Sequence, residues 1–136
     1  MIILDASVLI AHLESTDPNN RLALQLLRWS GAAALGASPL TLAEVLVRPI
    51  RAGYLRDVQG KLRELRMAEV PLGQHAAVRL AMLRAETNLK LPDCCVLLAA
   101  EDGSATAILT LDDRLRAQAR RLGFDCPDVH PESMQP

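Results

Sequence analysis

The chain begins with MIILDAS, residues 1–7, and this stretch decides the fold that the rest of the sequence predicts. Residues 1–4 form a short apolar, partly β-branched run, which is typical of a buried strand. Asp5 ends the run, and the residues from Ser7 to about Glu14 favour a helix directly after it. The sequence therefore opens with a strand that leads into a helix, and an acid lies at the junction.

Similar units follow along the chain. Further strands are predicted at 32–37, more weakly at 68–71, at 105–109, and in a last short piece near Phe124. Further helices are predicted from Leu22 to just before Gly31, from Ser38 to a kink or end near Val47 caused by Pro49, and over 55–67, 74–86, 91–100 and 112–122. Alternating strands and helices indicate an α/β three-layer sandwich, with a central, mostly parallel sheet of four or five strands flanked by helices.

Length and composition indicate one domain. The chain has 136 residues, half of them apolar, which suffices for a single core. We expect one domain over residues 1–127 and a short polar tail over 128–136. Three cysteines fit poorly with a disulfide framework, and neither a signal peptide nor a membrane span is recognisable, so a cytoplasmic protein is expected.

Two acids are predicted at the carboxyl ends of strands, where ligands gather in open parallel sheets. Asp5 closes the first strand, and Asp112 follows the strand at 105–109 with Thr110 beside it. If these strands are neighbours, the two carboxylates face one another, which is unfavourable without a cation between them. Each acid, like Asp93 at the start of the helix from Leu91, could instead simply cap a helix.

Glu44 differs because it lies inside a predicted helix, where no cap is needed. Helical spacing places Leu42, Ala43, Leu46 and Ile50 on one face, and Thr41, Glu44, Arg48 and Arg51 on the opposite one. Glu44 could form a surface ion pair with Arg48 four residues on. Taken together, however, four acids from strand ends and helices supply the oxygen ligands that Mg²⁺ takes.

Four short segments carry these acids in order: IILDAS (2–7), PLTLAEV (39–45), LPD (91–93) and ILTLD (108–112). Each segment is a weak signal alone. Their order and separation resemble the PIN-domain family and, within it, the VapC toxins of prokaryotic toxin–antitoxin pairs. The resemblance extends from Met1 to about Asp125.

The resemblance implies a site and an activity. Asp5, Glu44, Asp93 and Asp112 would be the catalytic, metal-binding acids for Mg²⁺ or Mn²⁺, with Ser7 and Thr110 as supporting hydroxyls. The implied activity is endoribonuclease cleavage of structured RNA, such as transfer or ribosomal RNA, that leaves a 5′-phosphate. A homodimer and a small VapB-type antitoxin that blocks the acidic site are also implied.

Asp113 leaves one assignment open. It adjoins Asp112, and either acid could face the metal. The T-x-D spacing favours Asp112, with Asp113 as a cap or a supporting residue.

The net charge of −1 excludes a general nucleic-acid coat, but residues 48–66 contain six basic residues and two acids. Arg48, Arg51 and Arg56 in this segment are candidate contacts for RNA or the antitoxin, although such charge runs are usually solvated helical faces.

Other classes of protein fit the sequence less well. The three histidines, His12, His75 and His130, have no zinc-ligand spacing, and no glycine-rich dinucleotide motif follows the first strand. A phosphoacceptor signalling domain would need an acid pair after the first strand and a lysine after the last one. A housekeeping PIN nuclease without an antitoxin shares the chemistry and remains the nearer alternative.

Overall fold

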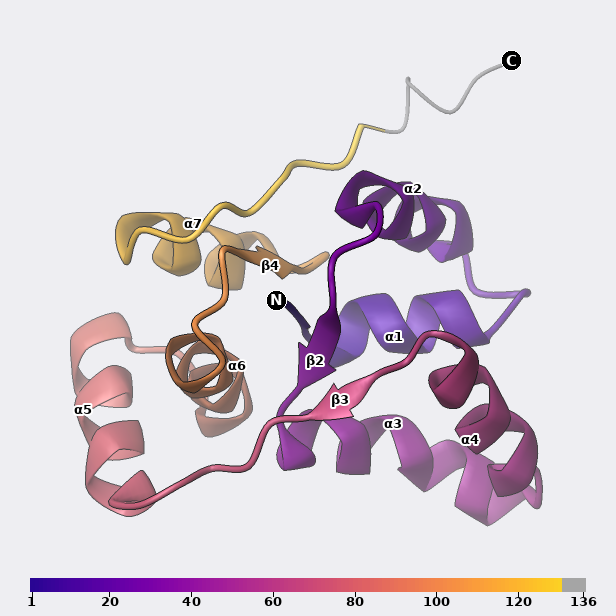
Figure 1. Cartoon of the computed structure of the whole chain (residues 1–136), viewed down its shortest axis with the longest axis horizontal. Helices are drawn as coiled ribbons and strands as arrows, with labels where there is room; N and C mark the ends of the chain where they lie inside the picture. Colours follow the sequence, from indigo (N-terminus) through magenta and orange to yellow (C-terminus); the bar gives the residue numbers. More distant parts are fainter. Residues whose placement is uncertain (131–136) are drawn as a thin grey trace.

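The computed structural model describes residues 1–130, and a parallel sheet lies at their centre (Figure 1). Its strands are β1 (Ile2–Leu4), β2 (Leu35–Ala37), β3 (Ala68–Glu69) and β4 (Ala107–Leu109). They lie in the order β3-β2-β1-β4, and every neighbouring pair is parallel. The predicted fold class is confirmed.

Helices cover both faces of the sheet. They are α1 (Ala6–Leu13), α2 (Asn20–Ser30), α3 (Pro39–Ala52), α4 (Leu55–Glu64), α5 (Ala76–Thr87), α6 (Leu91–Asp102) and α7 (Asp113–Arg121). In Figure 1, α1 to α4 lie on one side of the sheet and α5 to α7 on the other. The strands therefore form the middle layer of a three-layer sandwich.

The alternation of side chains along the strands produces two cores. Ile2, Leu4 and Leu109 face α1 to α4, whereas Ile3 and Ile108 face α5 to α7. All five are buried, because β1 and β4 are covered on both faces. This explains why these two strands read as continuous apolar runs.

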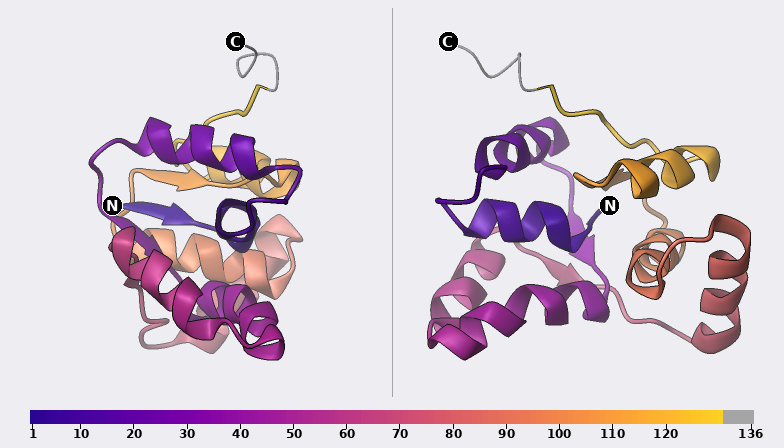
Figure 2. Two further views of the ribbon diagram at one scale, coloured as in Figure 1. Left: turned by 90° about the vertical axis from the view of Figure 1, so that its right-hand side faces the viewer. Right: turned by 180° about the vertical axis from the view of Figure 1, so that it is seen from behind.

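The order of the strands brings the acid-bearing ends together. β1 and β4 lie side by side and run the same way, as the left view of Figure 2 shows. Leu4 pairs with Leu109, so Asp5 and Thr110 are the next residues on neighbouring strands. The backbone N–H of Asp5 donates to the carbonyl of Leu109 (3.1 Å), which fixes this register at the carboxyl edge of the sheet.

Of the kink or end predicted near Val47, the end is wrong. Pro49 lies inside α3, which continues to Ala52 and ends where Gly53 adopts a left-handed conformation (φ 83°). Proline removes one backbone hydrogen bond, but its ring is buried, and this packing offsets the loss. The helix end is set by Gly53, which has no Cβ to strain.

Other boundaries differ by a few residues. The strand predicted from residue 32 begins at Leu35, and the helix predicted to reach residue 67 ends at Glu64. Arg66 is left-handed (φ 53°), and the N–H of Met67 bonds to the carbonyl of Leu62, which closes that helix. The helix predicted from residue 74 begins at Ala76 and ends at Thr87.

The chain after α7 returns to the sheet. Asp125 bridges β4 through hydrogen bonds to Ile108 (2.9 Å) and Thr106 (3.1 Å), where a short strand was predicted near Phe124. Asp128, in the predicted tail, forms ion pairs with Arg116 (3.7 Å) and Arg120 (3.1 Å). Residues 131–136 of that predicted tail lie outside the described residues.

Two further observations concern the chain as a whole. Among the described residues, no helix combines the length and the apolar character that crossing a membrane requires. Cys94, Cys95 and Cys126 are free thiols, and all three are buried. The adjacent Cys94 and Cys95 lie among the buried residues of α6.

Candidate functional site

Asp5 is the most deeply held acid of the candidate site. It is only 5% exposed and forms the N-cap of α1, where its Oδ1 accepts from the N–H of Val8 (3.3 Å). The hydroxyl of Ser7 donates to the same oxygen (2.5 Å), and the hydroxyl of Thr110 donates to Oδ2 (2.5 Å). Three of about four acceptor positions of the carboxylate are thus used inside the protein, which leaves about one on Oδ2.

Ser7 and Thr110 also hold the segment that follows β4. The oxygen of Ser7 accepts from the N–H of Leu111 (3.1 Å), and that of Thr110 accepts from the N–H of Asp112 (2.9 Å). Each hydroxyl therefore donates to Asp5 and accepts from the backbone of the loop after β4. This network locks the ends of β1 and β4 together, as a supporting role for both hydroxyls requires.

Asp112 and Asp113 point to different surroundings. Asp112 caps α7, accepting at Oδ1 from the N–H groups of Arg114 (2.8 Å) and Leu115 (3.1 Å), and it lines the cleft beside Asp5. The side chain of Asp113 is 96% exposed and pairs with Arg116. The geometry favours Asp112 as the acid of the cleft.

Glu44 and Asp93 reach the same cleft from two other helices. Ser38 caps α3, whose first turns carry Glu44, and Asp93 lies in the first turn of α6. A hollow of about 160 Å³ is lined by Asp5, Ala6, Ser7, Thr41, Glu44, Pro92, Asp93, Val96 and Asp112. All four predicted acids therefore line one cleft, although their role as metal ligands stays a prediction.

The predicted faces of α3 were partly wrong. Its buried residues are Thr41, Val45 and Pro49, whereas Ile50 is exposed. Thr41 was placed on the polar face, but it is buried because its hydroxyl bonds to Ser38 (3.0 Å). Glu44 lies next to this buried face, so it borders the cleft while remaining accessible to solvent.

Three carboxyl groups of the cleft, those of Asp5, Glu44 and Asp93, have raised pKa values. Burial, together with the negative charges of Asp112, Asp5 and Glu44, raises the pKa of Asp93 to about 6. Burial is also the main cause that raises the pKa of Asp5 and of Glu44, and the charge of Asp5 adds to the effect on Glu44. The cleft is therefore a concentrated negative site, which a bound cation would stabilise.

The donor set fits a hard divalent cation. Carboxylate oxygens are the ligands that Mg²⁺ and Mn²⁺ take, and both ions retain several waters. Within residues 1–130, no three His, Cys, Asp or Glu side chains already stand in a coordinating arrangement. Mutual repulsion of carboxylates explains why they line the cleft without closing on one point.

Replacing Asp93 by Asn is expected to stabilise the protein at pH 7.5 in EDTA. The pKa of about 6 in the folded chain exceeds the ordinary value of 3.8, so this group favours folding fully below pH 4 and loses that contribution as the pH rises through 6. The neutral amide avoids the loss, and the gain should be about 1 kcal/mol after solvent screening. Thermal unfolding at pH 4 and 7.5 measures it, with Asp57→Asn as a control for the substitution. An equal effect at both pH values would contradict the prediction.

One residue beside the site was not found by sequence reasoning. Arg116 is 6% exposed, and its Nη2 donates to the carbonyl of Thr110 (2.8 Å). In the sequence it is one of several arginines in residues 114–121, and helical spacing alone does not separate it from its exposed neighbours. The only available signal was its position between Leu115 and Ala119, on the buried side of α7.

Fold and site together define an α/β domain with an acidic cleft at the carboxyl ends of parallel strands. The chain belongs to the PIN-domain family, because its sequence matches the family model described as "PIN domain" over residues 2–121. No curated protein matches the sequence.

Solved structures share this fold at low sequence identity. A toxin–antitoxin complex from Klebsiella pneumoniae contains a chain that is 24% identical, with a TM-score of 0.69 over 82% of this chain and 87% of that one. VapC20 of Mycobacterium tuberculosis, described as a toxin that cleaves the sarcin–ricin loop, is 16% identical (TM-score 0.65, 87% and 95%). VapBC2 of Rickettsia felis, bound to a DNA fragment from its promoter, is also 16% identical (TM-score 0.65, 96% and 100%).

Proposed function

We propose that this chain is a Mg²⁺- or Mn²⁺-dependent endoribonuclease that acts as the toxin of a VapBC-type toxin–antitoxin system. One observation carries the proposal: acids from β1, α3, α6 and α7, far apart in sequence, line one cleft. Asp5, Glu44 and Asp93 all have raised pKa values there, and neighbouring carboxylates contribute to each shift. Because the fold holds these carboxylates close together despite their mutual repulsion, a bound cation would stabilise the site.

The residues of the cleft have distinct tasks in this proposal. Asp5, Glu44, Asp93 and Asp112 would hold the ions, which when bound supply an activated water and stabilise the departing oxygen of a phosphodiester. Ser7 and Thr110 orient Asp5, because each donates its proton to one of the carboxylate oxygens. Asp112 is held by its own N–H and by its capping bonds, so the edge of the cleft is rigid before any ligand arrives.

Structured RNA is the proposed substrate. The relative from Mycobacterium tuberculosis is described as cleaving an RNA loop, and PIN-type chemistry suits a phosphodiester. The direct test incubates the purified chain with total transfer and ribosomal RNA in Mn²⁺ and sequences the resulting ends. Discrete cuts that leave 5′-phosphates are expected, and intact RNA beside a folded protein would reject the proposal.

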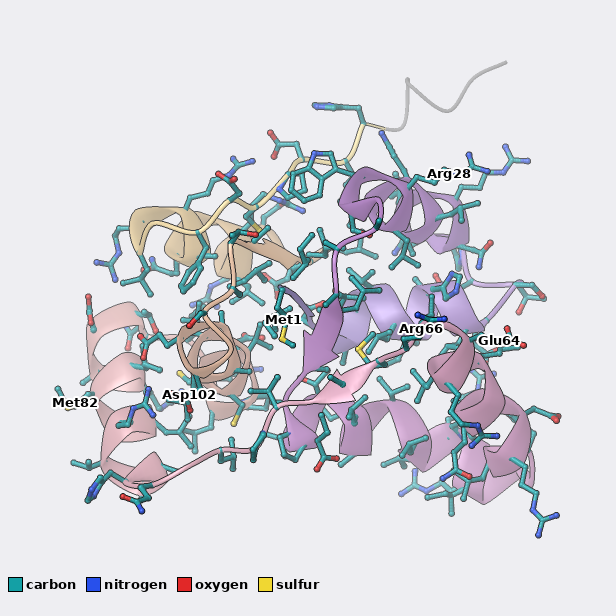
Figure 3. The ribbon with its side chains drawn as sticks, viewed as in Figure 1. Met1, Arg28, Glu64, Arg66, Met82 and Asp102 are labelled. Atoms are coloured by element: carbon teal, nitrogen blue, oxygen red, sulfur yellow. The ribbon has the colours of Figure 1, made fainter. Side chains whose placement is uncertain are left out.

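A small antitoxin and a second copy of the chain are the proposed protein partners, in the cytoplasm. Complexes with antitoxins are the described state of the relatives from Klebsiella and Rickettsia. Exposed apolar side chains support such contacts: Val78 and Met82 lie on α5, where Met82 (66% exposed) points outward in Figure 3. A toxin should arrest growth when it is expressed alone, and co-expression with the antitoxin encoded by an adjacent gene should relieve that arrest. A housekeeping nuclease would need no such partner.

The basic residues of α3 and α4 are proposed to contact the RNA. Arg48, Arg51 and Arg56 are exposed, and Arg48 lies one helical turn beyond Glu44. Charge reversal at Arg51 or Arg56 should raise KM about tenfold at low salt and leave kcat nearly unchanged, because the contacts bind phosphate without touching the reacting bond.

Steady-state cleavage at two salt concentrations measures this effect. Arg28→Glu on α2 is the matched control, since Arg28 is exposed on a different helix (Figure 3). An equal loss in the control would assign the effect to net charge instead of to this surface.

A further inference from the structure

The guanidinium of Arg116 is buried directly behind the acidic cleft. It leaves α7 on the side of β4, and its Nη2 donates to the carbonyl of Thr110 (2.8 Å). Its Nη1 donates to Asp113, and its Nε has no hydrogen-bond partner among the described residues but lies 3.7 Å from the Oδ1 of Asp128. Burying a charged guanidinium costs desolvation free energy, and an apolar side chain of similar volume would avoid that cost. The hydrogen bonds of Arg116 are therefore the feature that an apolar side chain could not supply.

The hydrogen bonds of the Arg116 guanidinium hold the loop between β4 and α7. Two of the three contacts of Arg116 fall on residues 110–113, the segment that carries Asp112. Arg120, one turn further along α7, binds only the chain beyond the helix: it donates to the carbonyl of Cys126 (2.6 and 2.9 Å) and pairs with Asp128. Both arginines therefore contact the C-terminal segment through Asp128, but among the described residues only Arg116 also bonds through its guanidinium to the loop that carries Asp112.

Thr110 is the point at which the contact of Arg116 reaches the acids. Its carbonyl is held by Arg116, while its hydroxyl donates to Asp5 and accepts from the N–H of Asp112. A displacement of the Thr110 backbone would shift its hydroxyl as well, and so would move the bond to Asp5 and the bond to Asp112 together. The bond from Arg116 to the carbonyl thus bears on the relative placement of two acids that follow neighbouring strands.

We propose that Arg116 is a positioning residue for the proposed cleavage reaction: by fixing the carbonyl of Thr110 it keeps Asp5 and Asp112 in place along one cleft, where both could bind a divalent ion. The inference rests on the proposed function but concerns a residue outside the acidic set. The guanidinium of Arg116 bonds to none of the four carboxylates that would bind the ion, so the effect of this side chain is indirect. Partners of this kind typically change metal affinity or activity by about 10- to 100-fold.

Arg116→Lys tests the proposal because lysine retains the charge but loses the planar fork that reaches Thr110 and Asp113 together. Calorimetric titration with Mn²⁺ should give a dissociation constant raised about tenfold or more, and kcat for RNA should fall about 10- to 100-fold with KM unchanged. Arg120→Lys is the matched control and should resemble the wild type in both measurements. Wild-type Mn²⁺ affinity and kcat in Arg116→Lys would overturn the proposal, even if that variant unfolds at a lower temperature.

A second variant tests the same path at Thr110, and Arg116→Met, which has a similar length but no donor, replaces Arg116→Lys in every measurement if that variant does not fold. Thr110→Val preserves the shape of the side chain but deletes the hydroxyl through which Arg116 is proposed to act. Thr110→Val should weaken Mn²⁺ binding about as much as Arg116→Lys does. The double variant should bind Mn²⁺ no more weakly than whichever single variant has the lower affinity. Unchanged Mn²⁺ binding in Thr110→Val, or strictly additive losses in the double variant, would contradict the proposed path.

The two proposals fail separately. A wild-type protein that binds Mn²⁺ but leaves RNA intact rejects the proposed function alone, because the comparison of Mn²⁺ affinities remains valid. Equal Mn²⁺ affinities in an active nuclease reject the role of Arg116 alone.

Discussion

Asp5→Asn is expected to lower the rate of RNA cleavage by at least about 10³-fold, the scale seen when a central catalytic carboxylate is removed. The carboxylate of Asp5 has a fixed position: it is buried, and both of its oxygens are oriented by hydroxyl groups. An amide at this position has no negative charge for a cation. Single-turnover cleavage in saturating Mn²⁺ measures the loss directly.

The same substitution should leave the fold intact. The amide oxygen of Asn can still accept from Val8 and Ser7, and the hydroxyl of Thr110 can rotate to accept from the NH₂ group. Removing a buried charge whose pKa is raised also relieves repulsion in the cleft. The unfolding temperature in EDTA should therefore be equal to that of the wild type or higher.

Asp102→Asn is the matched control, because it makes the same chemical change outside the cleft, at the C-terminal end of α6, where Asp102 pairs with Arg79. It should cut RNA at nearly the wild-type rate. Substantial activity in Asp5→Asn would mean that the four acids do not act as one metal-binding set.

Removal of divalent ions is the second prediction with a large effect. The wild-type protein in excess EDTA should cut RNA no faster than Asp5→Asn, and added Mg²⁺ or Mn²⁺ should restore cleavage. Metal should also stabilise the fold, since an ion that binds only the folded chain at about 100 times its dissociation constant contributes about 2.7 kcal/mol. For a domain of this size, that contribution raises the unfolding temperature by about 5–10 °C.

Thermal unfolding with and without Mn²⁺ checks the stabilisation independently of any RNA. Asp5→Asn should lose most of the increase, because it lacks one of the charges that attract the ion. Full cleavage in EDTA, or an equal temperature increase in Asp5→Asn, would show that the cleft is not the metal site.

The local sequence was sufficient to predict β1 and β4, because an apolar run followed by an acid can be recognised within a few residues. Residues 2–4 and 107–109 are continuous apolar runs followed within a few residues by an acid, and a strand covered on both faces needs no other pattern. Local sequence failed at Pro49, where the missing hydrogen bond predicted an end to the helix. Burial of the proline ring against the core is a tertiary effect, which no window of a few residues contains.

The candidate site divides in the same way. Asp5 and Asp112 could be located from sequence because strand ends in a parallel sheet meet at one edge. Glu44 could not be placed as securely, since its approach to the cleft depends on which face of α3 is buried, and Thr41 and Val45 define that face only after packing. Arg116 gave no usable signal, because burial alone distinguishes it from the other arginines of α7.

The sequence by itself determined the α/β class, the acids at the carboxyl ends of β1 and β4, and the PIN-domain family. These features follow from residues adjacent in the chain, or from the order of short segments along it. The tertiary structure alone decided which aspartate of the pair 112–113 faces the cleft, how Glu44 and Asp93 join it, and what Arg116 holds. Such choices depend on contacts between residues as far apart as Asp5 and Thr110, and only folding creates these contacts.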